Sequence, residues 1–348
     1  MMKNENDQVT PIWEADILGD GFTQTVIDLG NDPDDETDIA VTVVKFSPSP
    51  LTSSDTPEPE YASRPAVLWV HGMSDYFFQD HVARRFHDKG YAFYAVDLRK
   101  CGRSLRPGQR AHHITNLELY DVDMNAAIDV IREAGHPSVT PLGHSTGGLI
   151  VALWLYRLRS ADPDRFGFIN VAVLNSPWLG LQFKNPVGIA VKALTRLMAV
   201  IRPDQLTPDK GMSGYGQSIS ASHHGDWVFD AVLKPVEGHV KTWSWFQAIL
   251  AAQAIVAKGI EMGVPTLVLH SDASILGKPY SPALDTVDAI LDAEQIASKT
   301  RCLGKGASNF EIPGARHDVF LSREHAREQA FAVTFDFLES HLTTASSS

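Results

Sequence analysis

The chain contains few cysteines and no long apolar run. Its two cysteines, Cys101 and Cys302, fit neither a disulfide framework nor a metal-ligand spacing, which predicts free thiols in a reducing compartment. No stretch has the roughly 18 consecutive apolar residues needed to cross a bilayer, so no transmembrane segment is expected. The first residues have neither a basic start nor an apolar core, which argues against a secretory signal. We therefore expect a cytoplasmic protein.

The chain has little positive charge, with a net charge of -12. Its basic residues are scattered rather than clustered. Such a chain repels phosphate backbones, so nucleic acid is not an expected partner. An uncharged or apolar small molecule is a better candidate ligand. The acidic run at residues 32–38 is interpreted as a solvated hairpin tip rather than a metal site.

From residue 65 onward, short apolar runs alternate with amphipathic segments, a pattern typical of parallel strands joined by crossover helices. Strands are expected at residues 66–70, 91–97, 138–142, 168–174, 265–270 and 308–312, and helices at 79–88, 117–134, 148–159, 288–298 and 323–341. Before them, residues 24–29 and 39–46 predict a hairpin, and residues 47–64 an exposed connection.

The alternation stops between residues 176 and 258, a segment that is rich in tryptophan and mostly helical in pattern. We interpret it as a cap inserted between two strands. The expected organisation is an N-terminal hairpin and connection at 1–64, an α/β core at 65–175 and 259–348, and a cap at 176–258. The predicted fold class is therefore α/β, with a mostly parallel central sheet flanked by helices and an inserted, mainly helical cap.

Ser145 lies in the sequence Gly-His-Ser-Thr-Gly, between a predicted strand and a predicted helix. A tight strand-to-helix turn exposes such a serine above the sheet edge, and glycines on both sides relieve crowding. The pentapeptide alone is also consistent with a serine that only caps the following helix. Three further features, the third of them an acid, favour a nucleophile.

The first feature is the turn His71-Gly72-Met73, which follows a strand and opens at the same sheet edge. The backbone N–H groups of Met73 and Thr146 would there form an oxyanion hole. The second is His317, on a loop after the last predicted strand, where an imidazole can take the proton of Ser145.

An acid that orients His317 is expected after the strand at 265–270. Three carboxylates are candidates. One helix and one strand separate the acid from the histidine, which takes roughly 25 to 30 residues. This spacing favours Asp288, provided that residues 275–287 form an inserted loop. Asp272 is the second choice and Asp285 the third.

Taken together, the segments VLWVHG, AVDLRKCGRS, GHSTGG, NSPW, VPTLVLHSD and GARHDVF resemble the α/β-hydrolase superfamily. Within this superfamily, the segments resemble the monoacylglycerol lipase-like and serine aminopeptidase S33-like members in particular. The chain departs from the family pattern at Lys100 and Cys101, and at Ser274, where the family commonly has its acid. The stretch VDAILDAEQI resembles what normally follows that acid, which also favours Asp288.

The resemblance implies a serine hydrolase that cleaves a small-molecule carboxylic ester with an apolar acyl or lipid-like chain. It also implies that no cofactor and no metal are needed. Trp178, Phe183, Trp243 and Phe246 of the cap are candidates for the acyl pocket. Histidines 112, 113, 223 and 224 are read as exposed loop residues without an assigned role. Hydrolysis of a thioester, an amide or a C–C bond, or loss of catalysis in favour of binding, remain alternatives.

Overall fold

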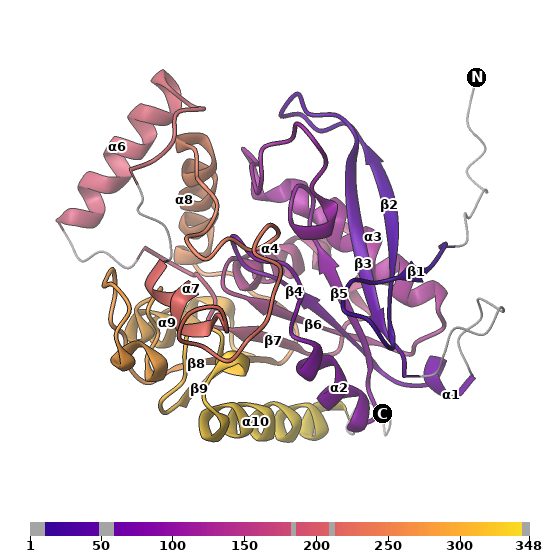
Figure 1. Ribbon diagram of the computed structural model, residues 1–348. Coiled ribbons are helices and arrows are strands. Elements are labelled where there is room, and N and C mark those ends of the chain that lie inside the picture. The colour runs from indigo at the N-terminus through magenta and orange to yellow at the C-terminus, as the bar shows by residue number, and fades with distance from the viewer. Residues whose placement is uncertain (1–10, 49–58, 182–185, 209–212, 343–348) are drawn as a thin grey trace, which may run out of the picture.

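The computed structural model describes residues 11–48, 59–181, 186–208 and 213–342. Nine strands form one sheet, in the order β1-β2-β3-β5-β4-β6-β7-β8-β9 (Figure 1). The strands are β1 Glu14–Ala15, β2 Phe22–Gly30, β3 Ile39–Phe46, β4 Ala66–Val70, β5 Ala92–Asp97, β6 Val139–His144, β7 Ala172–Asn175, β8 Thr266–Ser271 and β9 Ala307–Ile312. Pairing is antiparallel from β1 to β5 and parallel from β5 to β9.

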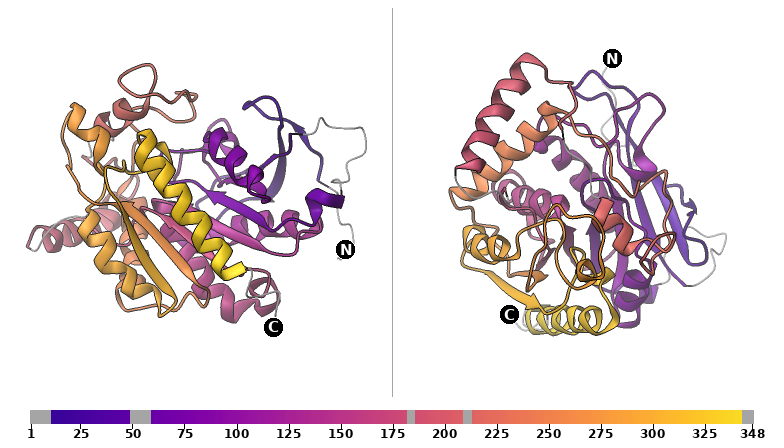
Figure 2. Two further views of the ribbon diagram at one scale, coloured as in Figure 1. Left: turned by 90° about the horizontal axis from the view of Figure 1, so that it is seen from below. Right: turned by 60° about the vertical axis from the view of Figure 1, so that its left-hand side comes forward.

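Helices cover both faces of the sheet, and Figure 2 shows α10 lying across one of them. They are α1 Pro59–Ala62, α2 Asp80–Asp88, α3 Tyr120–Glu133, α4 Thr146–Ala161, α5 Pro163–Phe166, α6 Val187–Ile201, α7 Ser213–Ile219, α8 Trp243–Ala257, α9 Ala293–Thr300 and α10 Glu324–Leu342. None of the described helices is long and apolar enough to cross a membrane.

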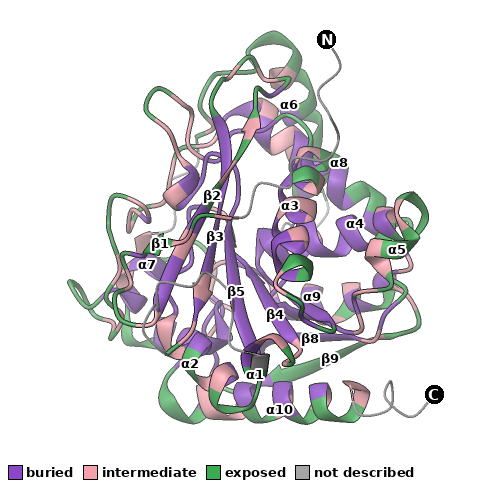
Figure 3. Cartoon of the chain, turned by 90° about the vertical axis from the view of Figure 1, so that its right-hand side faces the viewer, coloured by how far each residue is buried: buried purple, intermediate pink, exposed green. Residues whose placement is uncertain are grey.

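Alternate residues of the central strands supply two separate cores. In β4, Leu68 packs with apolar residues of α3 and α4, whereas Trp69 packs with those of α2 and α10. This division follows from the period of two along a strand, which points successive side chains to opposite faces. The central strands are buried on both sides, whereas β9 lies at an exposed edge (Figure 3).

Helices α6, α7 and α8 lie between β7 and β8, so the chain leaves the sheet there and returns after the insertion. Helix α8 packs against α4 and α6, and α6 projects away from the sheet (Figure 1). The mixed, mostly parallel sheet, the flanking helices and this helical insertion agree with the predicted fold class.

The acidic run at residues 32–38 is solvated only in part, since Asp35 and Asp38 are exposed but Asp32 is buried, which corrects the interpretation of the sequence. Lys100 is fully buried, and its Nζ lies 2.7 Å from Asp32 Oδ2 and 2.8 Å from Glu36 Oε2. Burial alone would raise the pKa of Asp32, but the hydrogen bond and charge of Lys100 outweigh it and lower that pKa. The described residues contain no cluster that could hold a metal ion.

Several other bounds differ from those expected, among them the strand expected at 168–174, which is β7 Ala172–Asn175. The helix predicted from residue 288 begins at Ala293, where Asp292 caps it by accepting from Gln295 N–H. Within the described end of the expected connection at 47–64, residues Pro59–Ala62 form α1, and the Tyr61 hydroxyl is buried and donates to the Phe46 carbonyl at 2.8 Å.

Candidate active site

Ser145 occupies the turn between β6 and α4 in a backbone conformation that L-residues rarely adopt, with φ 54° and ψ -116°. Close packing around it explains the flanking glycines. A Cβ on Gly147 would lie 2.4 Å from the backbone oxygens of Val70 and His71, and one on Gly143 would lie 2.6 Å from the oxygen of Gly147. The backbone atoms of neighbouring elements pack closely around this turn and keep it in its strained conformation.

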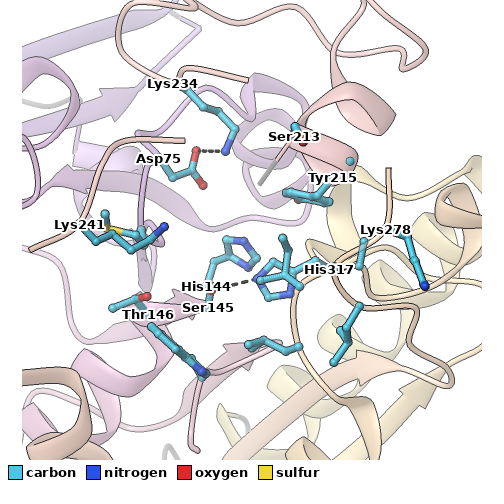
Figure 4. Close-up of a pocket in the computed structure, with 18 of the residues that line it drawn as sticks. Asp75, His144, Ser145, Thr146, Ser213, Tyr215, Lys234, Lys241, Lys278 and His317 are labelled. Atoms are coloured by element: carbon cyan, nitrogen blue, oxygen red, sulfur yellow. Dashed lines mark hydrogen bonds and ion pairs between the residues drawn. The ribbon is translucent and has the colours of Figure 1, made fainter. Parts of the chain in front are cut away.

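Ser145, His317 and Asp288 form a continuous chain of hydrogen bonds (Figure 4 shows the first link). Ser145 Oγ lies 2.9 Å from His317 Nε2, and His317 Nδ1 lies 2.9 Å from Asp288 Oδ2. An ionised carboxylate only accepts, so a neutral imidazole in this position bears its proton on Nδ1 and has Nε2 available to accept from the hydroxyl. All three residues are buried.

Asp288 reaches this position although its sequence location is unusual. Its backbone pairs with the segment around Ser274, with Asp288 N–H donating to Ala273 O at 2.9 Å and Ile275 N–H to Asp288 O at 3.0 Å. Residues 275–287 therefore leave the core after Ser274 and return beside it. The second Asp288 oxygen accepts from the N–H groups of Ile290 and Leu291, which fixes the carboxylate.

The other two candidate carboxylates do not contact His317. Asp272 is exposed and accepts from Gly314 N–H at 2.9 Å. Asp285 pairs with Arg316 at 2.9 Å and with Arg323 at 2.6 Å. Of the three, the structure brings only Asp288 to the imidazole.

The two candidate oxyanion donors lie on either side of Ser145. Thr146 is the first residue of α4, and Met73 follows Gly72, where an added Cβ would lie 3.0 Å from Ser145 Cβ. Within the described part of the chain, neither backbone N–H is engaged by another protein group. Both residues line the cavity that contains Ser145.

The cavity above Ser145 has a volume of about 680 Å³, a size suited to a small ligand. Three parts of the chain enclose it: the turns of the sheet edge, the cap segment that includes Gly214 and Tyr215, and the inserted loop from Leu276 to Pro279. The sequence predicts this loop, but not that it forms a wall of the cavity.

The four candidates for the acyl pocket have different positions. Trp178 lines the cavity, and Phe246 stacks behind it with ring centroids 6.4 Å apart. Trp243 is buried at the start of α8, and neither it nor Phe246 is among the lining residues. These two therefore support the cap rather than the described cavity wall. Phe183 lies outside the described residues.

Several cavity residues escaped the sequence analysis. Lys234 Nζ lies 2.7 Å from Asp75 Oδ1 in a buried ion pair, and Lys241 and Lys278 also line the cavity. The ring of Tyr215 meets His317 edge-on at 5.6 Å. Asp75 could have been noted, because it follows Met73 by two residues. The cap residues had no such signal, since they lie in segments without a motif.

Burial lowers the pKa of three histidines near the site, His112, His113 and His144. Burial lowers the pKa of His144 to about 4, and its Nδ1 contacts the Asn175 carbonyl at 3.2 Å. His112 and His113 were expected on an exposed loop but are both buried. His113 Nδ1 lies 3.1 Å from Thr242 Oγ1, which links this loop to the cap.

Comparison with known proteins places the chain in a family. A family model described as "Serine aminopeptidase, S33" matches residues 61–323, and the chain belongs to this family of α/β-hydrolases. Phospholipase YtpA of Bacillus subtilis is 32% identical over 288 residues, which cover 81% of this chain and 98% of that protein. A monoacylglycerol lipase of Mycolicibacterium smegmatis is 26% identical, covering 76% of this chain and 85% of that protein.

A solved structure has the same fold at low sequence identity. The monoglyceride lipase from Saccharomyces cerevisiae, in complex with a substrate analog, superposes with a TM-score of 0.58 and 15% identity, covering 95% of this chain and 94% of that one. These relatives are hydrolases of the lipase and esterase type.

Proposed function

We propose that the protein hydrolyses a carboxylic ester with an apolar acyl chain, using Ser145 as nucleophile, His317 as general base and Asp288 as the group that orients it. The observation that carries this proposal is the hydrogen-bonded chain, with both links at 2.9 Å. A serine hydroxyl is a weak nucleophile at its ordinary pKa, and a base positioned in this way activates it.

In this mechanism Ser145 Oγ attacks the ester carbonyl carbon while its proton passes to His317 Nε2. The N–H groups of Met73 and Thr146 stabilise the oxyanion, a contribution of several kcal/mol in comparable sites. The C–O bond then breaks, and the alcohol leaves with the proton from His317. Water then attacks the acyl carbon while giving a proton to the same nitrogen. The bond to Ser145 Oγ breaks, His317 returns the proton to Oγ, and the acid is released.

The charge distribution favours ester cleavage over aminopeptidase activity. An aminopeptidase needs a carboxylate that is available to the substrate ammonium. Among the described residues lining the cavity, only Asp75 has a carboxylate, and this carboxylate forms an ion pair with Lys234. The oxygens that could bind a cationic amine are therefore neutralised.

A fluorophosphonate probe tests whether Ser145 is a nucleophile at all. We expect stoichiometric labelling of the folded protein at Ser145, lost in Ser145→Ala and kept in Ser160→Ala, a variant on the exposed side of α4. Absence of labelling in the folded protein would mean that the chain binds a ligand without catalysis.

The bond that is cleaved is tested with p-nitrophenyl esters of increasing chain length, alongside aminoacyl arylamides and a thioester. We expect turnover of the esters to be fastest. Faster turnover of an arylamide or of the thioester would replace the ester assignment with that alternative.

A further inference from the structure

Asp318, which directly follows His317 in the chain, is a fully buried carboxylate. Within the part of the chain that the structure describes, no cation forms an ion pair with it, and its oxygens accept from amide N–H groups. Taking a charge out of water is costly unless hydrogen bonds replace the lost solvation. The hydrogen-bonded chain of Ser145, His317 and Asp288 makes no use of this second carboxylate.

Both oxygens of Asp318 have donors from elsewhere in the fold. Oδ1 accepts from Asn175 Nδ2 at 2.7 Å and from Phe320 N–H at 3.0 Å. Oδ2 accepts from Gln79 Nε2 at 3.1 Å. Asn175 and Gln79 are themselves fully buried. Hydrogen bonds to an ionised acceptor are the strong ones, so this carboxylate fixes its two amide partners firmly.

The orientation of the two side-chain amides follows from their other contacts. Asn175 Oδ1 accepts from Val319 N–H at 3.2 Å. Gln79 Oε1 accepts from Phe78 N–H at 3.0 Å. A backbone N–H only donates, so in each amide the oxygen faces the backbone and the nitrogen faces Asp318. The network is therefore complete only with a carboxylate at its centre.

The network joins the three segments that carry the proposed catalytic groups. Asn175, at the end of β7, also accepts from Ser145 N–H through its backbone carbonyl, at 2.9 Å. Gln79 precedes α2, in the same connection from β4 that contains Met73. The carboxylate itself is next in the chain to His317. One buried group thus connects the turn of the nucleophile, the segment of an oxyanion donor and the loop of the base.

We propose that Asp318 is a positioning residue, whose hydrogen bonds to Asn175 and Gln79 keep the Ser145 hydroxyl and the His317 imidazole at reacting distance. This inference rests on the proposed ester hydrolysis. A base must lie within about 2.6 to 3.2 Å of the atom whose proton it takes. A misplacement of about 1 Å lowers the rate by roughly a hundredfold. Asp318 does not line the cavity, so it acts through these groups and not on the substrate.

The test moves the carboxylate from one side of a hydrogen bond to the other. Asp318→Asn places an amide nitrogen against Gln79 Nε2, so two donors face each other. In the double variant Gln79→Glu/Asp318→Asn, the new carboxylate accepts from the new amide, which restores the hydrogen bond and the total charge. The rate of Ser145 labelling by a fluorophosphonate measures the reactivity of the hydroxyl, and hydrolysis of a p-nitrophenyl ester gives kcat and KM.

Asp318→Asn should lower the labelling rate and kcat by about a hundredfold, with KM within about twofold of the wild type. The double variant should recover at least about tenfold of that loss. Asp123→Asn is the matched control. Asp123 is equally buried, but within the described chain its hydrogen bonds go to Arg99. This control should lower the midpoint of urea denaturation and leave the labelling rate within about twofold.

A wild-type labelling rate in Asp318→Asn would overturn the inference, and so would a double variant as slow as the single one. If Asp318→Asn does not fold, Gln79→Met takes its place. It removes one hydrogen bond to the carboxylate and should slow labelling by about tenfold. An unchanged rate in that variant would also overturn the inference.

The two readouts separate this inference from the proposed hydrolysis. Ester turnover by the wild type, together with variants that keep its rate, would leave the hydrolase assignment intact and refute only the role of Asp318. A wild type that is labelled but cleaves no ester would refute the ester assignment, and the labelling rates would still decide the role of Asp318. A wild type that is neither labelled nor active would refute both.

Discussion

Asp285 and Arg316 form a 2.9 Å ion pair between the same two chain segments that Asp288 and His317 join. Arg316 immediately precedes His317, and its side chain is fully buried. The inserted loop is therefore fastened twice to the segment that carries the imidazole. Asp285 was the third candidate for the acid, and the structure instead gives it two arginine partners.

This arrangement predicts that Arg316→Gln lowers the free energy of unfolding by about 3 kcal/mol, because it leaves the Asp285 carboxylate without its buried partner. Arg323→Gln is the matched control. Arg323 touches the same carboxylate, but its side chain is 45% exposed, so its removal should cost less than about 1 kcal/mol. Urea denaturation of both variants checks the ranking, and equal losses would contradict it.

Asp288→Asn should lower kcat by about ten-thousand-fold, since an amide at this position no longer holds the imidazole in the required tautomer. Asp272→Asn should stay within about twofold of the wild type, because the Asp272 side chain is exposed and contacts only a backbone amide within the described chain. Steady-state hydrolysis of a p-nitrophenyl ester measures both. The reverse ranking would transfer the role of the acid to Asp272.

Gly147→Ala should destabilise the fold by about 3 kcal/mol, because the added methyl group meets backbone oxygens that cannot move aside. Gly167→Ala provides the comparison. There the nearest atoms would lie 3.4 Å from the new Cβ, and φ is -62°, so the change should stay within about 1 kcal/mol. Thermal unfolding of both variants is the measurement. A tolerated alanine at position 147 would show that the turn can relax.

The stability of the protein should fall as the pH drops from 7 to 5. Burial lowers the pKa of His144 from an ordinary value of 6.5 to about 4, so the unfolded chain binds a proton in this range that the native state does not. Stability is therefore present above pH 6.5 and is lost as the pH falls towards 4. His144 alone contributes about 2 kcal/mol to the difference between pH 7 and pH 5.

Urea denaturation of the wild type and of His144→Phe at both pH values isolates this contribution. The variant loses the contact with the Asn175 carbonyl at either pH, so only the difference between the two pH values is informative. We expect that difference to shrink by about 2 kcal/mol in the variant. An unchanged pH dependence would mean that His144 has the same pKa in the native and unfolded states.

Much of the sheet could be predicted because its strands are short, continuous apolar runs. Residues 39–46 and 66–70 were predicted with the bounds that β3 and β4 have. The start of α9 was misplaced because DAILDAEQI has a helical pattern, whereas Asp288 is held in an extended backbone beside Ser274. A tertiary contact outweighed local propensity there.

The acidic run shows the limit of charge patterns. From the sequence, Asp32 and Glu36 are expected to form an acidic surface. Lys100 contacts both of them only in the folded chain, because it lies more than sixty residues away in the sequence. The same limit applied to His112 and His113. Their burial depends on the cap that covers their loop, and no local pattern encodes it.

The sequence by itself determined the alternation of strands and helices, the strand-to-helix turn at Ser145 and the chain order of serine, acid and histidine. These are local properties, set by apolar periodicity and by glycines that a crowded turn requires. Only the tertiary structure decided which aspartate reaches His317 and which charges face the cavity. Both depend on distances between segments far apart in the chain, and hydrogen bonds and ion pairs act only over a few ångströms.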